Sequence, residues 1–176
     1  MERLAIGKAI LELIRGDITK QDTDAIVNAA NSQLAPGGGV AGAIHRAAGP
    51  GLWEECKTLG GCRTGEAKLT SGYDLRAKYV IHTVGPVYSG TSQDAEDLRA
   101  CYRNSLRLAD ENLIRSVSFP AISTGSFGYP LEEAAQISLA TITEYIKEEN
   151  DLKLVRFVLY SQSAYDAFRS VLTFLM

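Results

Sequence analysis

The residues best suited to bind a ligand are two asparagines and three consecutive glycines between Asn28 and Gly49, in the stretch NAANSQLAPGGGVAGAIHRAAG. A short apolar run typical of the end of a buried strand precedes this stretch, and small and apolar residues that favour a helix follow the glycines. Glycine N–H groups are accessible because no Cβ covers them, and a helix start adds about half a positive charge. Asparagine side chains donate and accept hydrogen bonds without carrying charge. The stretch therefore predicts a site for a sugar beside a phosphate.

A second loop of small residues, Ser123-Thr124-Gly125-Ser126-Phe127-Gly128, has the composition of a phosphate-binding loop. Gly125 and Gly128 permit close approach of a ligand, and successive N–H groups can donate to phosphate oxygens at roughly 1.5–3 kcal/mol for each charge-assisted bond. An ordinary surface turn is the alternative interpretation of the same residues. Phe127 is unusual at an exposed turn, and packing against a bound sugar would account for it.

Two other candidates lie at the ends of expected strands. Asp17, followed by Ile18, can accept a hydrogen bond from the exocyclic amine of a base, although a capping role in its own turn is the alternative. The Tyr160 ring can stack on a base, or Tyr160 is a core residue with its hydroxyl at the surface. Ligands of open α/β sheets bind beyond the carboxyl ends of the strands. If these segments converge there with the two loops, they form a cleft for a diphosphate flanked by two sugars, one bearing a base.

Other classes of site receive little support. Gly37, Gly39 and Gly42 match G-x-G-x-x-G, but the first glycine lies well beyond the strand and no acidic residue follows at the spacing of a dinucleotide-binding fold. The P-loop pattern G-x-x-x-x-G-K-[ST] does not occur. His45 and His82 are interpreted as structural residues of a helix and a strand. The three cysteines form no C-x-x-C pair, so we expect no metal site.

The apolar pattern predicts strands that alternate with helices, which favours a three-layer α/β/α sandwich around a mixed, largely parallel sheet. The first two strands are expected to form an antiparallel edge. We expect one domain over residues 1–176. The expected strands are Leu4–Ile6, Ala9–Ile14, Asp24–Ala30, Glu66–Ser71, Tyr79–Val84, Ser116–Ala121 and Leu154–Tyr160, and the expected helices are Val40–Ala48, Leu52–Leu59, Asp94–Asn112, Leu131–Glu149 and a last helix that carries Phe168, Val171 and Leu175.

Composition restricts the partners. A chain of 176 residues that is 45% hydrophobic can bury a substantial core. Its net charge of −3 lacks the electrostatic footprint of a nucleic-acid-binding protein, so nucleic acid is not an expected partner. Lys8, Glu12 and Arg15 interrupt the first residues, which argues against a signal peptide or a membrane span there. The odd number of cysteines fits reduced thiols. These features predict a cytoplasmic protein, and we expect a monomer.

Four segments together resemble the macrodomain, an ADP-ribose-binding fold: GDIT at Gly16–Thr19, NAAN at Asn28–Asn31, GGGVAGAIHRAAG at Gly37–Gly49 and ISTGSFGYP at Ile122–Pro130. The resemblance implies ADP-ribose, free or attached to a protein, as the ligand, with no further cofactor. It implies that Asp17 binds adenine and Tyr160 stacks on it, that Asn31 orients the distal ribose and is important for turnover, and that an aromatic residue stands at Phe127. We expect Asn31 and Phe127 to be the catalytic residues, with Phe127 restricting the ribose and excluding bulk water. The remaining ligand contacts implied for the glycine loop are Gly37, Gly38, Gly39, Val40 and Ala41. Asn28, inside the strand end, is assigned a scaffold role.

The resemblance has one gap. MacroD-type hydrolases carry a catalytic aspartate ten residues after the second asparagine of NAAN, where this chain has Ala41. Other macrodomains with alanine there, including the coronaviral type, are associated with hydrolysis. We therefore expect removal of mono-ADP-ribose from acidic side chains, or deacetylation of O-acetyl-ADP-ribose, by a water that the ligand's own phosphate orients. A non-catalytic ADP-ribose reader, and a phosphoesterase or RNA-end-binding module, remain as alternatives.

Overall fold

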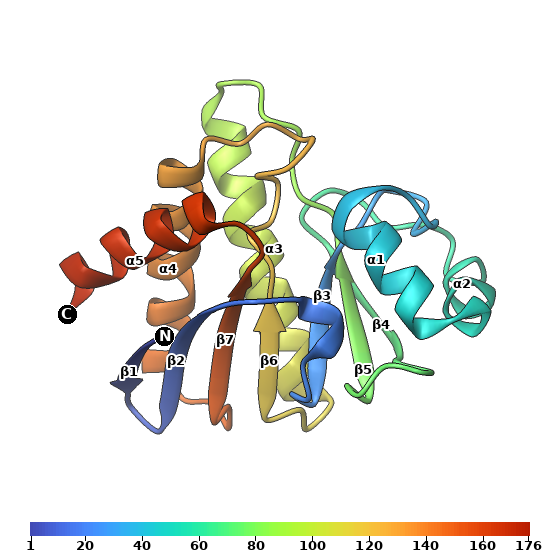
Figure 1. The fold of residues 1–176 in the computed structure, drawn as a ribbon, viewed down its shortest axis with the longest axis horizontal. Helices are drawn as coiled ribbons and strands as arrows, with labels where there is room; N and C mark the ends of the chain where they lie inside the picture. Colours follow the sequence, from blue (N-terminus) through green and yellow to red (C-terminus); the bar gives the residue numbers. More distant parts are fainter.

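A seven-stranded sheet runs through the computed structural model, which describes residues 1–176 (Figure 1). The strands lie in the order β1-β2-β7-β6-β3-β5-β4. Their bounds are β1 Glu2–Ile6, β2 Ala9–Arg15, β3 Ala25–Ala29, β4 Ala67–Ser71, β5 Tyr79–Thr83, β6 Ser116–Phe119 and β7 Leu154–Leu159. The helices are α1 Gly39–Ala48, α2 Pro50–Cys56, α3 Ser92–Glu111, α4 Leu131–Lys147 and α5 Gln162–Leu175, with a short 3-10 helix, η1, at Ile18–Lys20.

The five central strands are parallel, and the sheet has an antiparallel strand at each edge. The predicted mixed, largely parallel sheet is confirmed, as is the antiparallel pairing of β1 with β2. The second antiparallel edge, β4 with β5, was not predicted. The pattern of a strand predicts which of its faces is buried, but not the direction of its neighbour.

Helices cover both faces of the sheet, because successive strand residues point to opposite sides. In β3, Ala25 and Val27 join a cluster of 30 buried residues beneath α3, α4 and α5, whereas Ile26 joins a cluster of 14 beneath α1 and α2. Figure 1 shows these two helix layers on either side of the sheet. The predicted three-layer arrangement is confirmed.

Several element boundaries differ from the predicted ones, and the residues explain two of these differences. α2 begins at Pro50 rather than Leu52, since proline suits the first helical position. β6 ends at Phe119, because the following Pro120 has no N–H to donate to a neighbouring strand. No helix in the structure has both the length and the apolar character needed to cross a membrane.

The sheet opens between β3 and β6. These strands are paired only at Ala25 with Val117 and at Ile26 with Ser118, so their carboxyl ends diverge. β3 leads to α1 on one face, while β6 leads to α4 on the other face (Figure 1). Such a switch in the direction of the connections creates a crevice where ligands of α/β sheets bind.

Candidate functional site

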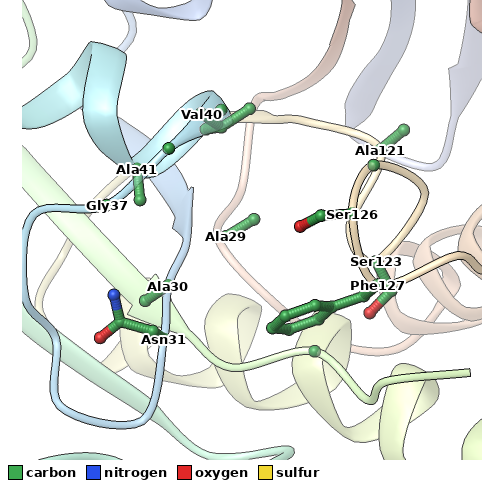
Figure 2. A pocket seen from close by; sticks show the side chains of 14 residues that line it. Ala29, Ala30, Asn31, Gly37, Val40, Ala41, Ala121, Ser123, Ser126 and Phe127 are labelled. Atoms are coloured by element: carbon green, nitrogen blue, oxygen red, sulfur yellow. The ribbon is translucent and has the colours of Figure 1, made fainter.

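A cavity of about 290 Å³ lies at this crevice. Its size is at the lower end of the range for small-molecule sites. Residues from the ends of β3 and β6, from the glycine loop and from the second small-residue loop surround it (Figure 2). The lining residues are Ala29, Ala30, Asn31, Gly37, Gly38, Gly39, Val40, Ala41, Gly85, Ala121, Ser123, Gly125, Ser126 and Phe127.

The glycine loop leads into α1 and places the uncapped N-terminus of this helix at the cavity. Gly38 is the N-cap of α1 and has no side chain with which to cap it. The first helical hydrogen bond runs from the Gly42 N–H to the Gly38 carbonyl at 3.2 Å, which leaves the N–H groups of Gly39, Val40 and Ala41 without a backbone acceptor. This end of α1 can therefore bind an anion.

The second loop presents further donors. Its backbone hydrogen bonds use the N–H groups of Thr124, Gly128 and Tyr129, and none uses those of Gly125, Ser126 and Phe127. All three of these residues line the cavity. Thr124 and Gly128, which were also predicted to bind ligand, do not line it: Thr124 Oγ1 donates to the Ala121 carbonyl at 2.8 Å, and the Gly128 N–H closes the turn onto Gly125 at 3.0 Å.

The two asparagines have different surroundings. Asn28 is fully buried, and its Nδ2 lies 3.0 Å from Nδ1 of His82, in agreement with a scaffold role. Asn31 lines the cavity, but its amide also closes its own loop. Nδ2 donates to the Ala35 carbonyl at 2.8 Å, and Oδ1 accepts from the Ala35 N–H at 2.9 Å. One N–H of Nδ2 and one lone pair of Oδ1 remain for a ligand.

Gly85, after β5, lines the cavity but was not predicted. A Cβ at this position would lie 2.2 Å from Ser123 Oγ and 2.6 Å from Ile122 Cγ2, so only glycine permits the second loop to pack here. Ser123 itself has a φ of 68°, and its buried hydroxyl has no protein partner. One feature of the sequence could have indicated that Gly85 lies at the site. The Gly85-Pro86 pair ends a strand and leaves the sheet at the same edge as the two loops.

Phe127 closes one side of the cavity. In Figure 2 its ring extends across the cavity from the second loop toward the side where Asn31 lies. The Phe127 carbonyl accepts a hydrogen bond of 2.9 Å from the Tyr88 N–H, so the segment after β5 supports this loop. An aromatic ring in this position can pack against a sugar beside Asn31.

Asp17, Ile18 and Tyr160 do not line the cavity, but they follow the neighbouring strands β2 and β7. The Gly16 N–H donates to the Leu159 carbonyl at 3.1 Å, which brings these two strand ends side by side. Asp17 caps η1 through Oδ1, which accepts from the Thr19 N–H at 2.9 Å and from the Thr19 hydroxyl at 2.7 Å. The side chain of Ile18 is buried in the core beneath α1.

These strand ends can still receive a base. The hydroxyl of Thr19 lowers the pKa of Asp17, so this carboxyl stays ionised near neutral pH, and Oδ2 has no hydrogen bond within the protein. Tyr160 is 84% exposed, so its role as a core tyrosine is wrong and its ring is free to stack.

No ionisable side chain lines the cavity. Neither histidine lines this cavity: burial lowers the pKa of His45, and burial together with the neighbouring His45 lowers that of His82 to about 3. No three His, Cys, Asp or Glu side chains are grouped as metal ligands would be. Backbone N–H groups, one amide, two serine hydroxyls and one aromatic ring therefore carry the chemistry of this site.

The model of the Macro domain family matches residues 27–138, which contain both loops and the cavity between them. The chain belongs to the macro domain family. A macro domain-containing protein of Chlorobaculum tepidum is 52% identical over 164 residues, which cover 93% of this chain and 95% of that protein.

Three further proteins that this chain resembles have an activity or a ligand in their names. The macro domain is 59% identical over 143 residues to the ADP-ribose glycohydrolase MACROD1 of Mus musculus, covering 80% of this chain but only 44% of the mouse protein. The solved macrodomain of Trypanosoma brucei in complex with ADP-ribose superimposes with a TM-score of 0.88 at 45% identity, over 92% of this chain and 68% of that one. The solved Oceanobacillus iheyensis macrodomain with ADP gives a TM-score of 0.96 at 44% identity, over 99% and 95% of the two chains.

Proposed function

We propose that this macro domain binds ADP-ribose in the cavity and hydrolyses mono-ADP-ribose from acidic side chains of proteins. The cavity supports this proposal because it combines an uncapped helix end, a second loop of free N–H groups and a sugar-sized space between Asn31 and Phe127. The similarity to the mouse glycohydrolase and to a macrodomain in complex with ADP-ribose supports the same ligand.

In the proposed complex the diphosphate lies between the two loops. N–H groups of Gly39 and Val40 on one side, and of Gly125 and Ser126 on the other, donate to its oxygens. The distal ribose lies beside Asn31 and Phe127. The adenosine half extends toward Asp17, whose free Oδ2 accepts from the adenine amine, and toward Tyr160, whose exposed ring stacks on the base.

The absence of ionisable side chains from the cavity is the observation that carries the proposed mechanism. An oxygen of the bound diphosphate orients a water in place of a protein carboxylate. The water oxygen bonds to the anomeric carbon of the distal ribose, and the bond from that carbon to the substrate's carboxyl oxygen breaks. The carboxylate leaves with the electron pair, and the water proton passes to solvent. Because the ribose and the water are held in fixed positions, positioning then accounts for most of the rate enhancement.

The same cavity can act on O-acetyl-ADP-ribose. There the water adds to the acetyl carbonyl carbon and the ester bond to the ribose oxygen breaks. The ribose oxygen takes one proton of the water, the other proton passes to solvent, and acetate is released. The free N–H groups that bind the diphosphate serve both reactions. A reader that binds ADP-ribose without turnover is the alternative, because binding and positioning use the same residues.

The deciding experiment follows ADP-ribose release from a glutamate-linked mono-ADP-ribosylated protein, with ADP-ribose binding measured by calorimetry. We expect release by the native protein and a rate lower by roughly 10²-fold in Phe127→Ala, because the ribose is no longer held in place. Phe174→Ala is the matched control, since Phe174 is 90% exposed on α5. Binding without release would establish a reader, and absence of both would refute the proposed ligand.

Asn31→Ala requires an additional measurement. This substitution removes both hydrogen bonds to Ala35, so it loosens the glycine loop as well as the ribose contact. We expect turnover to be lost and the free energy of unfolding to fall by about 1–2 kcal/mol. Urea unfolding of the same sample separates the two effects. Loss of turnover together with complete unfolding would leave Phe127→Ala as the decisive variant.

A further inference from the structure

A second cavity, of about 330 Å³, adjoins the first one. It lies between the glycine loop, α1 and the start of α2, and its lining includes Pro36, Gly37, His45, Arg46, Pro50 and Trp53. Figure 1 shows α1 and α2 next to each other at this end of the molecule. Gly37 lines both cavities. The glycine loop is therefore the wall between them.

The glycine loop packs tightly against α1. A Cβ on Gly42 would lie 2.2 Å from the Gly37 carbonyl oxygen, so only glycine at position 42 permits the contact. Gly37 also lies close to the predicted ribose position, because a Cβ on Gly37 would be 3.4 Å from Asn31 Nδ2. If ADP-ribose binds as proposed, its distal ribose and whatever is attached to it lie next to the second cavity, and its adenine lies at the other end.

Arg46 gives the second cavity its charge. It is exposed, it forms no salt bridge, and its Nη1 lies 3.1 Å from the Cβ position of Gly42, so the guanidinium folds back along α1 toward the glycine loop. No carboxylate lines the cavity, although Asp74 approaches Gly49 at one end. An unpaired arginine here favours an anionic partner.

The other lining groups suit a polypeptide. Trp53 is half-buried, and Pro36 and Pro50 are exposed, so together they offer apolar contact area. His45 is 7% exposed, and neither of its ring nitrogens has a hydrogen-bond partner. A buried polar group without a partner is rare in folded proteins. Burial lowers its pKa, so Arg46 remains the only charge in the lining.

We infer that the second cavity binds the polypeptide that carries the ADP-ribosyl group, with Arg46 selecting acidic residues beside the modified side chain. The inference rests on the proposed function, because it uses the predicted position of the distal ribose. It adds a preference for acidic segments of the target protein. Arg46 is a specificity-determining residue in this scheme and takes no part in bond breaking.

The test compares affinities for peptides that carry ADP-ribose through a non-hydrolysable amide linkage, flanked by either glutamates or glutamines, with that for free ADP-ribose. We expect the native protein to prefer the glutamate-flanked peptide by about three- to fivefold at low salt, the range of one exposed ion pair, and to lose the preference at high salt. Arg46→Gln should remove this preference, and Arg46→Glu should reverse it. Neither variant should change the affinity for free ADP-ribose.

Arg76→Glu is the matched control, because Arg76 is an exposed arginine that lines neither cavity. Equal affinities of the native protein for the two peptides, or the same effect of Arg46→Glu and Arg76→Glu, would overturn the inference while free ADP-ribose still bound. Failure of free ADP-ribose to bind would instead overturn the proposed function, and the inference with it.

Discussion

At the scale of single residues, Ala41 decides how the proposed reaction can work. Its side chain is 5% exposed and lines the cavity, and its N–H, in the first turn of α1, has no backbone acceptor. The position therefore combines access to the ligand with the positive end of a helix. A methyl group there cannot take a proton, so the proposed reaction uses the ligand's own phosphate to orient the water.

Ala41→Asp tests this argument. A carboxylate in the first turn of α1 is favoured by the helix dipole and can act as a general base, which typically contributes about 10²–10⁴-fold. We expect ADP-ribose release to accelerate by at least about tenfold. ADP-ribose affinity should weaken at the same time, because the new charge repels the diphosphate. Single-turnover release and calorimetry measure the two effects.

Ala43→Asp is the control for this substitution. It introduces the same charge in the same helix, at a residue that does not line the cavity. We expect its release rate to stay close to that of the native protein. If Ala41→Asp released ADP-ribose no faster than Ala43→Asp, the reacting water would not lie beside α1, and the proposed position of the ribose would need revision.

Residues with side-chain chemistry were easier to find in the sequence than residues that act through their small size. The structure brings Asn31, the three glycines, Ser123 and Phe127 to one cavity, as the two-loop interpretation required. It adds Ala29, Ala30, Gly85 and Ala121, whose small side chains leave room for a ligand. That contribution depends on which loops meet, as the 2.2 Å approach of Ser123 Oγ to a Cβ on Gly85 shows. No pattern of neighbouring residues in the sequence indicates which loops will pack against each other.

At the scale of elements, the start of α3 supports the cavity from outside. Asp94 accepts hydrogen bonds from the N–H groups of Ser89 and Gly90, each at 2.8 Å, and forms a capping box with Thr91. The segment that Asp94 holds includes Tyr88, whose N–H binds the Phe127 carbonyl at 2.9 Å. The Tyr88 and Tyr129 rings also pack at 4.9 Å between centroids. Asp94 is thus a positioning residue for Phe127.

The substitution Asp94→Asn tests whether the Asp94 carboxylate stabilises the segment that supports Phe127. Above all, the hydrogen bond from the Ser89 N–H lowers the pKa of Asp94 below the ordinary 3.8. The carboxylate therefore stabilises the fold above pH 3.8, and this contribution is lost as pH falls through the lower folded-state pKa. We expect Asp94→Asn to have a lower thermal midpoint than the native protein at pH 7, with the difference shrinking at pH 3. KM for the ADP-ribosylated substrate should rise.

Asp97→Asn is the control, because Asp97 is also on α3 but its hydrogen bond is to Gln93 on the same helix. Equal thermal midpoints for Asp94→Asn and the native protein at pH 7 would show that the capping network does not stabilise the segment. An unchanged KM would show that Phe127 keeps its position without it.

The order of elements could be predicted from periodicity, since each strand and helix has its own apolar pattern. The opening of the sheet could not. β3 and β6 separate after Ile26 and Ser118 because the chain leaves them for opposite faces, which is a property of the completed topology. Pro120 gave a partial signal, because it ends the strand that borders the crevice.

At the scale of the whole molecule, stability and ligand binding should respond differently to pH. His82 is fully buried between Asn28 and Thr70, and mainly because of this burial its pKa is lowered to about 3. Between its ordinary 6.5 and about 3, the unfolded chain takes up a proton that the folded protein does not. The free energy of unfolding should therefore decrease as pH falls below 6.5, by up to about 1.4 kcal/mol per pH unit from this one group. His45 acts in the same direction.

The cavity, by contrast, contains no ionisable side chain, and the pKa of Asp17, at the proposed adenine position, is lowered from its ordinary value mainly by the Thr19 hydroxyl. ADP-ribose affinity should therefore stay constant between pH 7.5 and pH 5.5 while stability falls. Urea unfolding and calorimetry on the same samples measure both quantities. In His82→Gln, which cannot take up a proton, the decrease in stability over this range should be smaller, although the variant starts from a lower value. If ADP-ribose affinity instead fell in step with stability, a titrating group would have to lie in the binding site. The proposal that the ligand's own phosphate replaces a protein base would then lose its main physical support.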